Sequence, residues 1–148
     1  KSHAMTGFRI GYAISAPEIV DKMSKLQALA MTNVSEPTQY VALKALTAEI
    51  SNNSRTIKKR LDAISKTARS MNLDFVEPDG SMYLFARPQK ENFDSVEFTN
   101  KLLDMGVAVA PGEGFGNYKE FIRISSCQPE DTLNQGMQII KDMLERQK

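Results

Sequence analysis

Residues 1–14 read Lys-Ser-His-Ala-Met-Thr-Gly-Phe-Arg-Ile-Gly-Tyr-Ala-Ile. In the second half of this stretch, aromatic and β-branched residues occupy every second position: Phe8, Ile10, Tyr12 and Ile14. A period of two puts them on one face of an extended chain, so the pattern predicts a β-strand over residues 7–14. No partner strand follows nearby, and the chain does not start with methionine. We therefore expect the sheet of this strand to lie in a preceding segment of a longer protein.

The rest of the chain alternates between helical and strand-like patterns. Apolar residues at helical spacing predict helices over these stretches: 17–31, 39–50, 55–71, 95–105 and 129–145. Short alternating runs predict strands over these: 74–77, 81–87, 107–110 and 121–125. We therefore expect an α/β fold, in which helices pack on a short mixed or mostly antiparallel sheet, preceded by a strand and helices of another domain.

A run of small polar residues, Ser51-Asn52-Asn53-Ser54, separates two of the predicted helices. Such residues add nothing to a hydrophobic core and favour turns, so they predict a break in the chain. We place the domain boundary there, with one domain in residues 1–50 and the other in residues 51–148.

Composition limits the class of partner and the kind of site. Lys and Arg total 19 against 18 acidic residues, a net charge of +1, which provides no field to attract nucleic acid or a membrane surface. One cysteine and one histidine exclude a disulfide and a zinc site built from this chain alone, so we expect no metal. No apolar run is long enough to span a membrane. We expect a cytoplasmic protein with a small-molecule ligand.

The order and spacing of residues 1–12 resemble the signature of fold-type-I pyridoxal-phosphate (PLP) aminotransferases of class I/II, the aspartate-aminotransferase-like group. In that signature a serine-lysine pair precedes a short loop and a Met-Thr-Gly-aromatic-Arg-Ile-Gly-Tyr strand. The resemblance implies that Lys1 is the catalytic lysine, which carries the cofactor as a Schiff base, and that Arg9 binds the cofactor phosphate. A guanidinium suits a phosphate because it donates paired hydrogen bonds. Without the resemblance, Lys1 is a frayed terminal residue and Arg9 a surface charge.

A second motif comprises Val-Ala-Val-Ala-Pro-Gly-Glu-Gly-Phe-Gly at residues 107–116 and Phe-Ile-Arg-Ile-Ser at residues 121–125. It resembles the strand, Pro-Gly-x-x-Phe-Gly loop and arginine-bearing strand of the same family. The resemblance implies that Arg123 binds the α-carboxylate of the substrate. An arginine between apolar residues is expensive to bury without an anionic partner, which agrees with this role. A structural salt bridge is the alternative.

The resemblance also implies an organisation and an activity. Residues 1–50 would be the tail of a large PLP-binding domain, and residues 51–148 the small carboxyl-terminal domain. We expect a homodimeric PLP enzyme that moves an amino group between an amino acid and a 2-oxo acid. In this family the preceding domain supplies further cofactor contacts, so we expect the chain alone to be inactive.

Other functions fit the same residues. The same fold serves other PLP enzymes, such as C–S lyases and cyclopropane-carboxylate synthases, and the sensor domains of some transcription regulators. A further alternative is an independent α/β interaction module, in which Lys1, Arg9 and Arg123 would not converge in space.

Overall fold

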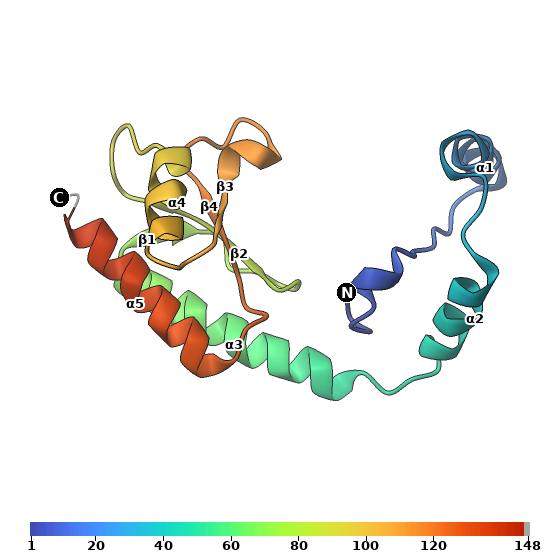
Figure 1. Cartoon of the computed structure of the whole chain (residues 1–148), viewed down its shortest axis with the longest axis horizontal. Coiled ribbons are helices and arrows are strands. Elements are labelled where there is room, and N and C mark those ends of the chain that lie inside the picture. The colour runs from blue at the N-terminus through green and yellow to red at the C-terminus, as the bar shows by residue number, and fades with distance from the viewer. Residues whose placement is uncertain (147–148) are drawn as a thin grey trace. The chain divides into compact units, whose positions relative to one another are not determined.

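The computed structural model describes residues 1–146 of the chain (Figure 1). The chain divides into two compact units, Lys1–Ser54 and Arg55–Lys148. The assignment of the first to a large cofactor-binding domain stays a prediction.

The first unit contains the 3-10 helix η1 (Thr6–Phe8) and the helices α1 (Pro17–Met31) and α2 (Glu36–Ala45). Helix α1 has the predicted bounds, with a proline in its first turn, where a missing N–H leaves no hydrogen bond unmade. Apolar residues of this helix are not buried, since Ile19 and Leu26 are 48% and 68% exposed. Neither α1 nor α2 has a buried residue, so their apolar side chains find no packing partner within this unit.

The strand predicted over residues 7–14 is not formed. Its first residues belong to η1, and residues 9–16 have no regular structure. A strand needs a neighbour to satisfy its backbone N–H and C=O groups. Within residues 1–146 every strand belongs to the second unit, so this segment has no neighbour with which to pair.

The second unit is built on a four-stranded sheet. Its strands are β1 (Leu73–Phe75), β2 (Tyr83–Pro88), β3 (Ala110–Pro111) and β4 (Ile122–Ser125). They lie in the order β1-β2-β4-β3, and every pair is antiparallel. This confirms the predicted α/β fold with a mostly antiparallel sheet.

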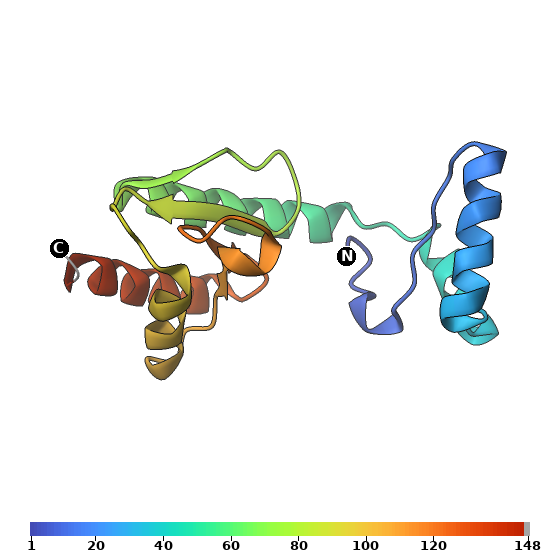
Figure 2. The same cartoon turned by 90° about the horizontal axis from the view of Figure 1, so that it is seen from above.

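Three helices accompany the sheet: α3 (Ser51–Ser70), α4 (Ser95–Asp104) and α5 (Glu130–Arg146). The later part of α3 runs along α5 (Figures 1 and 2), and Lys59 of α3 pairs with Glu130 at the start of α5. The polar residues 51–54 form the first turn of α3 and do not interrupt the chain as predicted. The Ser51 N–H donates to Glu49 Oε1 at 2.7 Å, and this side-chain acceptor satisfies an N–H at the start of the helix.

The two faces of the sheet differ in chemistry. One face, the inner face, is buried with apolar residues of α3, α4 and α5 in a single core; its strand residues are Leu73, Leu84, Ala86, Ile122 and Ile124. Alternate residues point to the opposite, outer face: Asp74, Tyr83, Phe85, Arg87, Arg123 and Ser125. The fold therefore gathers aromatic and charged side chains on one surface.

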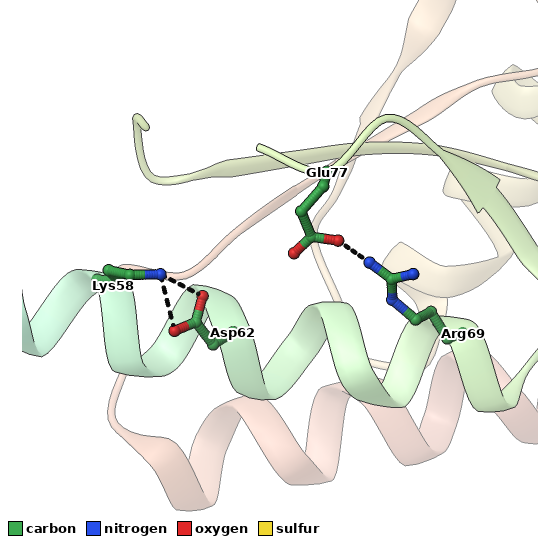
Figure 3. Close-up of polar contacts among 4 residues, drawn as sticks. All are labelled: Lys58, Asp62, Arg69 and Glu77. Carbon is green, nitrogen blue, oxygen red and sulfur yellow. Dashed lines mark hydrogen bonds and ion pairs between the residues drawn. The ribbon is translucent and has the colours of Figure 1, made fainter. Parts of the chain in front are cut away.

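Several basic residues of α3 are paired with nearby acceptors. Lys58 Nζ lies 3.0 Å from Asp62 Oδ1, and Arg69 pairs with Glu77 (Figure 3). Arg60 Nη1 donates to the carbonyl of Cys127 at 3.1 Å. These contacts neutralise part of the positive charge on this helix. No helix within residues 1–146 has the length and apolarity needed to cross a membrane.

Candidate functional site

The predicted cofactor residues lie at the two ends of a segment that folds back on itself. The Ala4 N–H donates to the Lys1 carbonyl at 3.0 Å, and the Phe8 N–H donates to the Met5 carbonyl at 3.1 Å. Arg9 follows η1 with φ 50° and ψ 43°, in the left-handed region. This conformation costs a residue other than glycine about 1 kcal/mol. Consecutive turns, and not a strand, therefore set the path from Lys1 to Arg9.

Both cations are available to a ligand. Lys1 is exposed, and its side chain has no carboxylate partner within residues 1–146. Arg9 is also exposed, and its Nη1 donates to the Thr6 carbonyl at 3.0 Å, with no acidic partner among the same residues. An amine can form a covalent bond to an aldehyde, and a guanidinium can hold a phosphate. The donor set of this segment thus fits a ligand that carries both groups, such as PLP.

Arg123 lies on the outer face of β4 against two aromatic rings. Its guanidinium carbon is 4.2 Å from the centre of the Tyr83 ring and 4.3 Å from that of Phe115. In the sheet, it stands between Phe85 on β2 and Ala110 on β3. The side chain is half-buried, yet it has no hydrogen-bond acceptor or carboxylate within residues 1–146. Its N–H donors are therefore left for an anion from outside this part of the chain.

Arg87 on the adjacent strand provides an internal comparison. Its Nε donates to Asp74 Oδ2 at 3.0 Å, and its Nη1 lies 3.4 Å from Glu120 Oε2. Arg87 therefore forms a structural salt bridge, which is the role that the sequence left open as an alternative for Arg123. Two arginines on one face of the sheet differ in that one is neutralised by carboxylates and the other is not.

The glycine-rich loop brings Phe115 into place. Gly112 opens η2 (Gly112–Phe115), and its N–H donates to the Phe121 carbonyl at 2.7 Å. A Cβ at this position would lie 2.7 Å from that carbonyl and would also meet the carbonyl of Tyr118. Only glycine allows the backbone to approach so closely. The loop therefore places the Phe115 ring beside Arg123.

Sequence reasoning did not identify the two rings that contact Arg123. Tyr83 lies in an alternating run that is equally typical of a core strand, and Phe115 lies in a loop of uncertain path. The sequence did contain part of the information. The period of two places Tyr83 and Phe85 on the same face of one strand, and Arg123 lies on the strand that follows the Pro-Gly loop. Pairing of β2 with β4 was the information needed to join them.

The predicted site residues are divided between the two units. Lys1 and Arg9 belong to the first and Arg123 to the second. The second unit also has an open hollow of about 310 Å³ at the start of α4, lined in part by Phe93, Glu97 and Lys101. None of the predicted residues lines this hollow, and Lys101 pairs with Glu97 one turn away on the same helix. No group of His, Cys, Asp and Glu within residues 1–146 is arranged to hold a metal.

Comparison with known proteins gives a consistent family. The model of aminotransferase class I and II matches residues 1–140. The chain is 36% identical to an aspartate aminotransferase of Thermotoga maritima, over 97% of this chain and 37% of that protein. It is 35% identical to a probable N-acetyl-LL-diaminopimelate aminotransferase of Bacillus subtilis, over 93% and 36% of the two chains. The chain thus spans less than half the length of these relatives.

Solved structures agree in fold. The crystal structure of the Thermotoga maritima aspartate aminotransferase superposes with a TM-score of 0.86 at 35% identity, covering 98% of this chain and 38% of that one. An aromatic aminotransferase from Pyrococcus horikoshii superposes with a TM-score of 0.85 at 29% identity, covering 99% and 41%. The helices and antiparallel sheet of the second unit match the small domain of such structures. This chain belongs to the class I and II aminotransferase family.

Proposed function

We propose that this chain is the carboxyl-terminal part of a PLP-dependent aminotransferase that moves an amino group between an amino acid and a 2-oxo acid. The observation that carries the proposal is Arg123, a half-buried arginine that has two aromatic contacts and no carboxylate within residues 1–146. Amino acids and 2-oxo acids share a carboxylate, which a guanidinium binds with paired hydrogen bonds. Family membership supplies the rest of the support.

Three residues have distinct roles in this proposal. When bound, PLP draws electrons from the α-carbon of the substrate. Lys1 Nζ would hold the cofactor covalently until the substrate amino group displaces it, and the freed amine would then accept and return the proton of the substrate α-carbon. Arg9 would hold the phosphate, and Arg123 would fix the α-carboxylate so that the α-carbon is presented in one orientation. An exposed lysine and an exposed arginine on one folded-back segment support the first two roles.

We expect the full-length protein to be a cytoplasmic homodimer. We expect the chain alone not to catalyse transamination. The first unit leaves large apolar side chains exposed, such as Tyr12 at 77% and Leu29 at 86%. Surfaces of this kind are typical of an interface with further protein. The names of the relatives favour transamination over the lyase, synthase and regulator alternatives.

The choice of amino acid depends on the groups that contact the substrate side chain. The relatives bear the names of aspartate and diaminopimelate enzymes, both of which act on amino acids with a second charged group. Residues 26–31, ahead of Thr32-Asn33, contain no arginine that could bind a carboxylate of the substrate side chain. We therefore propose an amino acid substrate without assigning its side chain.

Covalent trapping tests the proposal. The full-length protein is incubated with PLP, reduced with borohydride and digested, and mass spectrometry locates the phosphopyridoxyl group. We expect the group on Lys1, together with amino transfer from an amino acid to a 2-oxo acid that the Lys1→Ala variant lacks. Lys25→Ala is the matched control, since Lys25 is an exposed lysine of the same unit. Modification elsewhere, or unaltered transfer by Lys1→Ala, would overturn the assignment.

A further inference from the structure

The geometry points to Tyr83 and Phe115 as positioning residues that hold the Arg123 guanidinium ready for a carboxylate. This inference rests on the proposed function, in which Arg123 receives the carboxylate of the substrate. Neither ring is placed against the reacting atoms. Each acts through Arg123, and the two rings are named the aromatic clamp here.

The physical basis is the direction in which a guanidinium offers its donors. Its N–H groups lie in the plane of the group, whereas the face of an aromatic ring attracts the cation without accepting a strong hydrogen bond. The two rings of the clamp lie 4.2 and 4.3 Å from the guanidinium carbon of Arg123. They can restrain the side chain while its N–H donors stay unused. A carboxylate in place of the rings would restrain it equally well but would compete with the substrate.

Other arginine–ring contacts in the second unit lack this combination. Arg69 lies 5.1 Å from the centre of the Phe75 ring and also pairs with Glu77. Arg87 lies 5.6 Å from the Phe121 ring and also pairs with Asp74. In both cases a carboxylate uses the donors. Among residues 1–146, Arg123 has the two closest rings and no carboxylate.

The fold holds the clamp from two separate elements. Tyr83 is on β2, directly opposite Ser125 in the register with β4. Phe115 is at the end of η2, where its ring meets the Phe85 ring edge-on at 6.0 Å. Phe85 in turn stacks on Phe121 at 4.8 Å. Phe115 is therefore part of an aromatic cluster that ties the glycine-rich loop to the sheet, while Tyr83 is fixed by its place in β2.

The test uses the full-length aminotransferase and a ligand that reports carboxylate binding alone. The ligand is 4-methylpentanoate, which has a carboxylate and an apolar chain but no amino group. Its inhibition constant, and the KM of the amino acid substrate, are measured for Tyr83→Leu and Phe115→Leu. In each variant we expect both the inhibition constant and KM to rise about fivefold, which corresponds to the loss of one cation–π contact. We expect kcat to change by less than about twofold. Tyr83→Phe and Phe115→Tyr each keep a ring, so their inhibition constants and KM should equal those of the wild type.

Two further variants separate a positioning role from a general structural one. Phe75→Leu removes a ring beneath Arg69 and should leave both constants unchanged. In an Arg123→Met background, loss of either clamp ring should weaken inhibitor binding no further, whereas a general loss of structure would persist there. If the Leu variants melt at lower temperature, Tyr83→Met and Phe115→Met replace them, since methionine fills more of the volume without a ring.

The outcomes distinguish the inference from the function on which it rests. If Arg123→Met binds 4-methylpentanoate as the wild type does, Arg123 is not the carboxylate residue and the proposed role falls, with the clamp. If Arg123→Met binds it poorly while the Leu and Met variants of both rings bind it normally, the clamp alone is overturned.

Discussion

The Arg123 guanidinium carbon lies 4.2 Å from the centre of the Tyr83 ring, and the two residues are diagonal neighbours on adjacent antiparallel strands. Phe85 stands directly opposite Arg123, so an aromatic residue occupies both the facing and the diagonal position on β2. Cross-strand neighbours of this kind interact wherever one face of a sheet is partly buried. The register of β2 with β4 therefore creates an apolar setting for a cation that no carboxylate within residues 1–146 neutralises.

Replacing Arg123 by lysine should weaken substrate binding more than it harms folding. Lysine keeps the charge but cannot donate paired hydrogen bonds to a carboxylate. We expect KM of the amino acid in the full-length enzyme to rise about tenfold or more, the effect of losing one charge-assisted hydrogen bond. Steady-state kinetics measure this.

Arg87→Lys is the matched control, because Arg87 lies on the same face but is paired with Asp74 and Glu120. It should leave KM unchanged. An equal rise of KM in Arg123→Lys and Arg87→Lys would mean that substrate binding is weakened by the loss of any guanidinium on the outer face, and not by the loss of Arg123 in particular.

Gly112→Ala should destabilise the second unit by about 1–3 kcal/mol, the usual range for overpacking. The added Cβ would lie 2.7 Å from the Phe121 carbonyl and 2.8 Å from Phe121 Cβ, and backbone atoms cannot move aside as a flexible side chain does. Urea unfolding of the chain, followed by circular dichroism, measures the change.

Gly114→Ala is the control within the same 3-10 helix, since nothing lies within 4 Å of a Cβ there. It should change the free energy of unfolding by less than about 0.5 kcal/mol. A comparable loss in both variants would show that the loop resists any side chain, and that close backbone approach is not the cause.

The core of the second unit should respond to truncation, whereas apolar residues of the first unit should not. Leu84→Ala removes a fully buried side chain and should cost about 2–5 kcal/mol. Leu26→Ala removes one that is 68% exposed and should cost less than about 0.5 kcal/mol in the same urea titration. If Leu26→Ala proves as damaging as Leu84→Ala, α1 packs against something that this structure does not contain.

Local patterns predicted most elements of the second unit, because these elements are specified by nearby residues. The strand predicted over 107–110 is an exception, since β3 comprises Ala110–Pro111. Gly106 ends α4 with φ 83°, as a glycine after a helix should, and the side chain of Asp94 accepts the N–H groups of Val96 and Glu97 at its start. The periods of β2 and β4 match their buried and exposed alternation.

The first unit and the clamp could not be predicted in the same way. The alternation of residues 7–14 favours a strand, but a strand forms only where a partner supplies hydrogen bonds, and the sequence of the segment does not contain that partner. Likewise, residues 51–54 favour a break until Glu49 caps Ser51 and the run becomes a helical turn. Arg123 was predicted from a motif, whereas its contacts with Tyr83 and Phe115 depend on strand register and loop path, which are properties of the tertiary fold.

The contact between α3 and the start of α5 should depend on pH. Lys59 Nζ lies 2.7 Å from Glu130 Oε1, and this hydrogen bond and charge lower the pKa of Glu130 below its ordinary value of 4.5. A carboxyl group whose pKa is lowered on folding stabilises the fold above its ordinary pKa, and the contribution is lost as pH falls through the lowered value.

In Lys59→Met we expect the pKa of Glu130 to move up towards 4.5, as measured by NMR titration of its side-chain carboxyl carbon. The pKa of Glu49, lowered by hydrogen bonds from Ser51, should stay where it is and serves as the internal reference. If Glu130 titrates identically in Lys59→Met and in the wild type, the ion pair does not persist in solution. In that case α5 is held to α3 by its buried apolar residues and by the hydrogen bond from Arg60 to the Cys127 carbonyl.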